Sequence, residues 1–267
     1  MRLYLLIALS ILQIEIAAQS VSPQIGSRAN GIGYASAALF DTWSVFNNPA
    51  ASAQLKHVTA AFTYDLRYSL TGANRAAAVL NVPLPIGVCA AGAYRFGDDL
   101  YSEQILSVGF ANTFGLASLG AQVNYIQYTV SGFGTKGVAT INLGGIAELT
   151  PHLSVGAYIV NVNQPSLSEH EKLPTRLVAG LAFKPTEKIY VGAEIDKDLD
   201  FDPVWKAGME YTFHKQFVAR TGFNLNPNTG FFGFGFKTRK LMIDYAVQYN
   251  ALLRLSQQAS IAFQFNK

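Results

Sequence analysis

From His57 to the end of the chain, apolar residues recur at every second position. In residues 57–68, Val58, Phe62 and Tyr64 belong to an apolar series that alternates with polar or small residues. The same alternation returns in 189–196, 204–213 and 241–249. Successive side chains of a β-strand point to opposite faces, so a period of two predicts strands with one apolar face.

Extending this reading along the chain predicts about fourteen strands. Residues 57–267 supply about 15 residues for each strand with its connection, and a membrane-spanning strand needs about 9–11. We therefore expect one continuous antiparallel sheet, with no linker or second domain. The expected strands are 57–67, 74–82, 87–96, 103–112, 116–129, 136–148, 152–161, 174–184, 188–196, 204–213, 216–225, 229–237, 240–249 and 256–266.

The connections alternate between tight turns and longer polar segments. Tight turns are expected at 83–85, 150–151 and 214–215, and longer connections at 97–101 and 163–174. Outer-membrane barrels have short periplasmic turns and longer external loops. The alternation therefore favours such a barrel, and an even number of strands would place both of its ends in the periplasm.

Composition separates a membrane barrel from a soluble sandwich. Half of the residues are hydrophobic and 14% are charged, against about 25% in an ordinary soluble domain. The 12% aromatic content excludes disorder, and a net charge of +3 argues against a nucleic-acid partner. The polar face of the strands is rich in Gly, Ala, Ser, Thr and Asn, which suits a crowded lumen better than a wetted exterior. We expect an all-β, antiparallel transmembrane β-barrel of about 14 strands, with a soluble sandwich as the alternative.

The first eighteen residues have the pattern of a secretory signal peptide. Arg2 supplies the positive charge, Leu3 to Leu12 the apolar core, and Ala17-Ala18 a small-residue cleavage site. A membrane anchor is the alternative, but Gln13 and Glu15 shorten the apolar stretch. The signal peptide predicts export, and with the barrel it predicts the outer membrane of a Gram-negative bacterium.

Charged residues fall on the strand face that is expected to line the lumen. Both signs occur, so the simplest interpretation is a network of ion pairs that fills the barrel; a polar translocation path is the alternative. Arg28, which precedes the barrel, is a candidate partner for one of the carboxylates. The expected inward-facing charges are Asp65, Arg67, Arg75, Arg95, Glu148, Glu194, Lys206, Glu210, Arg220, Lys237 and Asp244.

Enzymatic and metal-dependent functions have little support in the sequence. His152 and Ser154 would share one strand face, as in a serine hydrolase, but His152 directly follows Pro151 at an expected turn. We therefore expect a turn histidine beside a lumen serine rather than a catalytic pair. The only cysteine, Cys89, cannot form an internal disulfide, and no Cys/His cluster is present. We expect no cofactor and no bound metal.

Residues 19–56 precede the barrel and differ from it in pattern. Asp41 could cap a short helix over Thr42 to Phe46, which Asn48-Pro49 would end. The Gly31-Ile32-Gly33 sequence lacks the strand, helix and later acidic residue of a dinucleotide-binding fingerprint.

This segment resembles the opening of the PorV/PorQ family, which comprises outer-membrane barrels of Bacteroidota related to the FadL transporters of hydrophobic compounds. The resemblance implies a fourteen-stranded barrel whose amino-terminal segment, here 19–56, lies inside the lumen as a hatch. The matching residues include Gly26, Arg28, Ala29, Gly31, Gly33, Asp41, Asn48, Pro49 and Ala50.

The resemblance implies two functions. A PorV-like barrel would be an interaction or accessory component of an envelope assembly such as type IX protein secretion, with the translocon or other envelope proteins as partners. A FadL-like barrel would take up hydrophobic small molecules, with a kink near the hatch that opens a lateral exit through the wall. Because the expected external loops are short, we expect the accessory role, with the FadL-like conduit as the alternative and a lipid hydrolase as a distant third.

Overall fold

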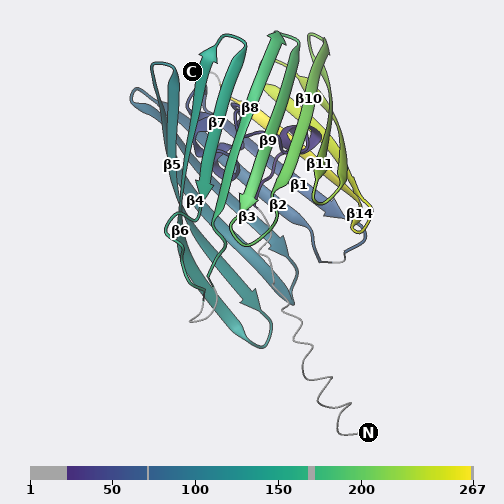
Figure 1. Cartoon of the computed structure of the whole chain (residues 1–267). Coiled ribbons are helices and arrows are strands. Elements are labelled where there is room, and N and C mark those ends of the chain that lie inside the picture. Colours follow the sequence, from purple (N-terminus) through teal and green to yellow (C-terminus); the bar gives the residue numbers. More distant parts are fainter. Residues whose placement is uncertain (1–22, 71, 168–171, 266–267) are drawn as a thin grey trace, which may run out of the picture.

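The computed structural model describes residues 23–70, 72–167 and 172–265; the expected signal peptide at 1–18 lies outside these ranges. Fourteen strands form one closed barrel (Figure 1). Their bounds are β1 Thr59–Arg67, β2 Arg75–Leu84, β3 Gly87–Gly97, β4 Tyr101–Phe114, β5 Ala117–Val130, β6 Gly134–Thr150, β7 Leu153–Val160, β8 Arg176–Thr186, β9 Ile189–Asp198, β10 Val204–His214, β11 Phe217–Leu225, β12 Thr229–Lys237, β13 Leu241–Asn250 and β14 Arg254–Gln264.

Every strand pairs antiparallel with its neighbours in the sequence, and β1 pairs with β14 to close the sheet. Thr59 is opposite Gln264 on β14 and opposite Asn81 on β2. Closure leaves no pair of stacked sheets, so the soluble sandwich is excluded. The prediction of an all-β antiparallel barrel of about 14 strands is confirmed.

The two faces of the wall differ because strand side chains alternate. On β5, Gln122 and Asn124 are buried inside the barrel, whereas Val123 and Tyr125 are at least half exposed on its outside. Large apolar residues occupy most outward positions of the other strands as well. The outer face is therefore an apolar surface, and the inner face carries most of the polar side chains.

The two ends of the barrel are built differently. We call the end where β14 finishes the turn end: two or three residues connect the strands there, as at 151–152, 187–188 and 215–216. The other end, the loop end, includes the connection between β7 and β8. Figure 1 shows the turn end at the top, near the carboxyl terminus, and β4 to β6 extending far toward the loop end.

The wall has no break along β3. Its pairing with β2 and β4 runs without a register shift. The shifts that do occur lie at the turn ends of β6–β7, β8–β9 and β10–β11. The FadL resemblance implies a kink near the hatch that opens a lateral exit; the continuous pairing of β3 leaves no such opening along this strand.

A notch in the wall occurs instead beside β7. This strand has 8 residues and β6 has 17, and pairing with β7 begins only at Leu143. The connection from β7 to β8 covers part of the free edge, because Asn163 bonds to the backbone of Ile141 and Ala139.

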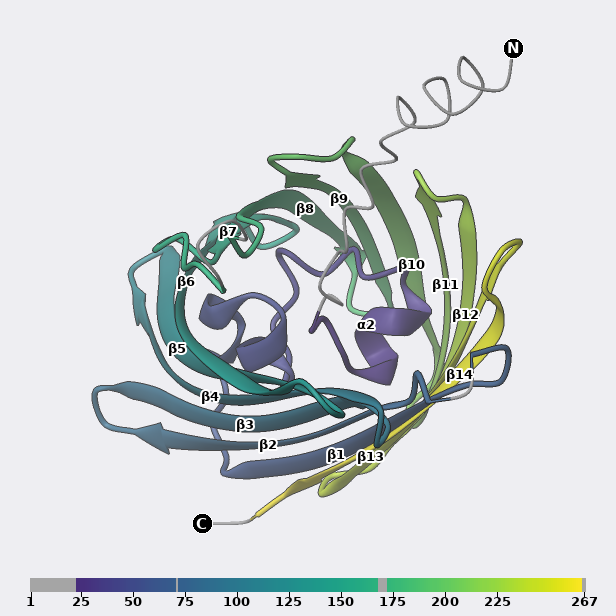
Figure 2. The same ribbon diagram turned by 90° about the horizontal axis from the view of Figure 1, so that it is seen from below.

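Residues 23–56, which we call the inner segment, fold inside the barrel (Figure 2). The segment contains a short helix α2 (Ser27–Gly31) and two 3₁₀ helices, η1 (Ser44–Phe46) and η2 (Pro49–Ser52). The expected helix over Thr42 to Phe46 is thus reduced to one turn. The carboxylate of Asp41 accepts a hydrogen bond from the amide of Thr42, but it does not cap η1.

No helix in the described ranges is long and apolar enough to cross a membrane.

Candidate functional site

Glycines on the inner wall form a seat for the inner segment. Gly156 on β7 and Gly208 on β10 lie directly against its backbone. A Cβ atom at Gly156 would be 2.1 Å from the carbonyl oxygen of Ala37, and one at Gly208 would be 2.1 Å from that of Ile32. Gly180 pairs with Gly156, and Gly222 pairs with Gly208, so the seat continues across several strands. These positions accept the segment because they have no side chain.

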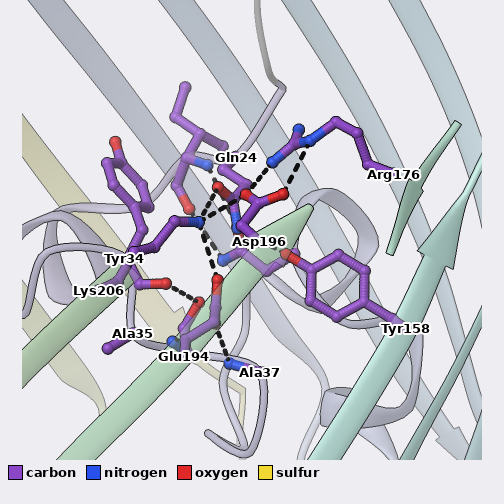
Figure 3. Close-up of polar contacts among 12 residues, drawn as sticks. Gln24, Tyr34, Ala35, Ala37, Tyr158, Arg176, Glu194, Asp196 and Lys206 are labelled. Carbon is purple, nitrogen blue, oxygen red and sulfur yellow. Dashed lines mark hydrogen bonds and ion pairs between the residues drawn. The ribbon is translucent and has the colours of Figure 1, made fainter. Parts of the chain in front are cut away.

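Glu194 on β9 joins the middle of the inner segment to the wall (Figure 3). Its Oε2 atom accepts hydrogen bonds from the amides of Ser36 at 2.9 Å and Ala37 at 2.7 Å. Its Oε1 atom accepts one from Nζ of Lys206 at 2.8 Å. Both charged side chains are almost fully buried, and the carboxylate binds two backbone donors and one cation.

Lys206 extends the same cluster to the start of the segment. Its Nζ atom donates to Oε1 of Gln24 at 3.1 Å and to Oδ2 of Asp196 at 2.8 Å. Arg176 pairs with Asp196, and the amide of Gln24 donates to the hydroxyl of Tyr158 at 2.6 Å. We call this group the Glu194 cluster. It consists of Gln24, Tyr158, Arg176, Glu194, Asp196 and Lys206 (Figure 3).

A second group, the Glu210 cluster, holds α2. Arg28 donates to both oxygens of Glu210 at 2.9 Å, in the planar two-bond arrangement that suits a guanidinium and a carboxylate. Arg220 donates to Glu210 at 2.6 Å and to Asp244 at 2.7 Å. Two cations and two carboxylates therefore alternate between the segment and β10, β11 and β13.

We expect removal of Glu210 to destabilise the barrel more than removal of Arg28. Glu210→Ala leaves the Arg28 guanidinium without a carboxylate and costs about 3–5 kcal/mol of unfolding free energy. Arg28→Ala leaves Glu210 paired with Arg220, so its cost is about 1–3 kcal/mol. Chemical unfolding of the purified protein measures both values. Equal losses would contradict this assignment of partners.

A third contact involves Arg75 of β2. Its guanidinium donates to Asp65 at 2.7 Å, to the backbone oxygen of Gln24 at 3.1 Å and to the hydroxyl of Tyr34 at 3.2 Å. Arg67 lies farther from Asp65, at 3.9 Å. At the turn end, Glu148 accepts a hydrogen bond from Gln54.

Arg95 was expected in the lumen, but it lies exposed on the outer face of β3. The reason is the apolar inner face of this strand. Tyr94 points inward and packs against Phe46 of the inner segment, with ring centroids 5.9 Å apart. Because apolar residues occupy the lumen side of β3, the charge of Arg95 lies on the opposite, outer face.

Sequence reasoning also omitted several residues of these clusters. Arg176 and Asp196 fall on inward positions of the expected strands, so the period of two could have identified them. Gln24 could not have been found in this way, because it belongs to the irregular inner segment. Ser260 bonds to Ser27, and Gln258 to Asn30, with neutral side chains that charge patterns do not detect.

The residues that resemble the PorV/PorQ family make close packing contacts within the inner segment and between it and the wall. Gly26 has φ of +109°, and a Cβ atom there would be 2.5 Å from Trp43. Asn48 donates to the carbonyl oxygen of Ala37 at 2.6 Å and accepts from the amide of Ala50 at 3.0 Å. Ala29 and Ala50 are fully buried. The other motif residues contact the wall: Gly31 lies close to Gly233, Gly33 close to Asn224, and Pro49 against Gly120.

On the loop side of the inner segment lies a small cavity of about 50 Å³. One part of its lining is apolar; the other carries amide and hydroxyl groups that bond to one another, as Ser107 and Thr140 do with Asn124. The apolar part comprises Val45, Phe46, Ile105, Ile126, Val160 and Leu173.

On the turn side lies a larger vestibule of about 790 Å³. Its inner end is formed by the Glu210 cluster and by Asp41, and its rim carries Lys184, Lys188 and Lys215. Burial raises the pKa of the Asp41 carboxyl, against the effect of nearby Arg28. The inner segment thus separates two hollows of different size and chemistry.

His152 and Ser154 do not form a catalytic pair. His152 is exposed, and its Nδ1 atom contacts the backbone oxygen of Lys184 at 2.8 Å. Ser154 is buried on the lumen side of β7. Within the described ranges, no group of three or more His, Cys, Asp or Glu side chains could hold a metal ion.

Comparison with known proteins gives no match to a family model, and no curated protein matches. Solved structures do match. The structure of a deletion mutant of the TodX monoaromatic hydrocarbon channel aligns with a TM-score of 0.72 and 13% identity, over 90% of this chain and 99% of that one. The Ralstonia pickettii toluene transporter TbuX aligns with a TM-score of 0.68 and 13% identity, over 92% of this chain and 99% of that one.

A Pseudomonas aeruginosa FadL homologue aligns with a TM-score of 0.65 and 12% identity, over 93% of this chain and 100% of that one. The chain therefore has the fold of FadL-like outer-membrane barrels. The narrower PorV/PorQ resemblance receives no support from these comparisons.

Proposed function

We propose that this protein is an outer-membrane conduit for small hydrophobic compounds, in which the inner segment acts as a hatch. The observation that carries the proposal is the inner segment itself, which divides the lumen into a partly apolar cavity and a charged vestibule. A general diffusion pore needs a continuous aqueous path, whereas here the inner segment lines both hollows and stands between them in the part of the chain that the structure describes. The likeness in fold to channels for aromatic hydrocarbons supports the same function.

Placement in a membrane follows from the outer face. Leu106, Val108, Val123 and Phe223 are each more than half exposed there, on three different strands. Such a surface suits the apolar band, about 25 Å tall, that a membrane barrel presents to lipid.

We expect an arginine to lower the unfolding free energy substantially only in the middle of this apolar band. Leu106→Arg, in the middle of β4, will lower the unfolding free energy in bilayers by about 2–4 kcal/mol, and Leu116→Arg, in the β4–β5 turn, by about 0–1 kcal/mol. Both leucines are more than 60% exposed, so a water-soluble protein would tolerate the two changes equally. Reversible unfolding in lipid vesicles distinguishes these outcomes.

The cavity next to the hatch is the proposed binding site. Its volume of about 50 Å³ is below the roughly 150 Å³ of a protein cavity that accepts benzene. Binding of an aromatic ring therefore requires neighbouring side chains such as Phe46 and Leu173 to move. Passage onward to the vestibule requires the hatch to move, because the inner segment lies between the two hollows.

Filling the cavity tests the function. Ile126→Trp places a large ring in it, whereas Val123→Trp, the control on the same strand, points outward. We expect cells with Ile126→Trp to take up labelled toluene as slowly as cells without the protein, and Val123→Trp to match the unmodified protein. Equal toluene uptake with and without the protein would reject the proposal.

The accessory role in type IX secretion rests on the motif in residues 24–54 and on the shortness of the expected external loops. The packing of Gly26, Asn48 and Pro49 inside the barrel gives those residues a structural role without a secretion partner. We therefore place the conduit first.

A further inference from the structure

The turn end carries a concentration of positive charge that the proposed conduit does not explain. In or beside the described turns at this end, 85–86, 115–116, 151–152, 187–188, 215–216 and 238–240, the acidic residues are Glu148 and Glu187. The basic residues in or beside these turns are Lys184, Lys188, Lys215, Lys237, Arg239 and Lys240, and Lys56 precedes the start of β1 at the same end. The loop end differs, because acidic residues, Asp98, Asp99, Asp198, Asp200 and Asp202, accompany its basic ones.

Four of these lysines lie along one side of the mouth of the vestibule. Lys184 and Lys237 occupy inward positions near the ends of β8 and β12, and Lys188 and Lys215 lie in turns; all four line the vestibule. Among the described residues, none of the four ammonium groups forms an ion pair. Side chains that lie at an opening are poorly placed for lipid headgroups, which surround the outside of the barrel.

The spacing of the four lysines indicates the size of the ligand. They belong to the β8–β9, β10–β11 and β12–β13 connections, and neighbouring strands are about 4.8 Å apart. Successive connections are therefore about 10 Å apart, and the first and third about 20 Å apart. A small anion would reach one or two lysines. An extended chain of about six residues spans the whole row, since each residue covers about 3.3–3.6 Å.

From this geometry we propose that the turn-end mouth is a docking site for an acidic segment, rich in Asp and Glu, of a soluble partner protein. Clustered carboxylates would meet four unpaired ammonium groups, and the field of the whole rim would accelerate the encounter. Short turns hold the lysines on a rigid support. The docking site goes beyond the conduit and does not depend on which compound passes through the lumen.

A fluorescent peptide of ten glutamates tests the docking site on the full protein in uncharged detergent. We expect saturable binding that weakens with salt. The variant Lys184→Gln/Lys188→Gln/Lys215→Gln/Lys237→Gln will lose affinity by about tenfold or more, because four exposed charge pairs act together. The control, Lys136→Gln/Lys172→Gln/Lys197→Gln/Arg254→Gln, removes the same charge from the loop end and will bind within about twofold of the unmodified protein.

Three results would overturn the docking site. Equal losses in both variants would mean that the peptide senses only net charge. Competition by inorganic phosphate at equal charge concentration would assign the lysines to small anions, and competition by soluble glycerol 3-phosphate, but not by inorganic phosphate, would assign them to lipid headgroups. The four single Lys→Gln variants repeat the test should the quadruple variant not fold. Toluene uptake is measured in parallel, so failure of the docking site is separable from failure of the conduit.

Discussion

Alanine at Glu194 will release the middle of the inner segment from the barrel wall. The change removes the acceptor for the amides of Ser36 and Ala37 and one of the two carboxylates paired with Lys206. Loss of one partner from a buried ionic group costs about 3–5 kcal/mol. We therefore expect a drop of that size in unfolding free energy and rapid hydrogen exchange at residues 32–38, measured by mass spectrometry.

Two further variants define the cause. Glu148→Ala removes another lumen glutamate, but one whose contact is with Gln54 at the turn end. It will leave exchange at 32–38 unchanged. Glu194→Gln keeps an acceptor for the two amides and loses the charge, so its effect will be intermediate. If Glu194→Ala leaves the segment protected, the Glu194 cluster does not hold it.

A single methyl group added to the wall at Gly156 will push the same part of the inner segment away from the wall. The added Cβ atom would lie 2.1 Å from the carbonyl oxygen of Ala37 and 2.5 Å from its carbonyl carbon, so backbone must move. Overpacking of this kind costs about 1–3 kcal/mol, and a backbone contact leaves little room for relief. We expect Gly156→Ala to expose residues 32–38 to exchange and to admit a small sugar through the lumen.

Gly145→Ala is the matched control. Gly145 lies on the neighbouring strand, faces outward, and would place its Cβ 3.4 Å from the nearest side-chain atom, an ordinary contact. The same glycine-to-alanine change there will leave both exchange and sugar entry unaltered. Sugar entry in both variants would show a general loosening of the barrel. Entry in neither would show that the seat tolerates a methyl group at Gly156 and is therefore not tight.

The period of two was sufficient to predict the barrel because it depends on a local property, the alternation of side chains. It placed Glu194, Lys206 and Glu210 on the lumen face, where the structure has them. It misplaced Arg95, because the apolar inner face of β3 is set by contact with Phe46, which is distant in sequence.

The site was harder to predict because its partners are irregular. No periodicity connects Gln24 to Lys206 or Ser27 to Ser260; these contacts exist only once the segment has entered the closed barrel. The glycines of the strands could be seen in the sequence. That they form a seat could be recognised only from the path that Ile32 to Ala38 take through the barrel. The cavity and the vestibule also depend on that path, so the sequence could not predict them.

The central claim, that compounds pass only when the hatch moves, is tested most directly by a reversible cross-link. The hydroxyl oxygens of Ser27 and Ser260 are 2.7 Å apart, so cysteines there are close enough for a disulfide. In a Ser27→Cys/Ser260→Cys protein that also carries Cys89→Ala, we expect oxidation to reduce toluene uptake to the level of cells without the protein and reduction to restore it. Toluene uptake that is the same in the cross-linked and the reduced protein would contradict a moving hatch.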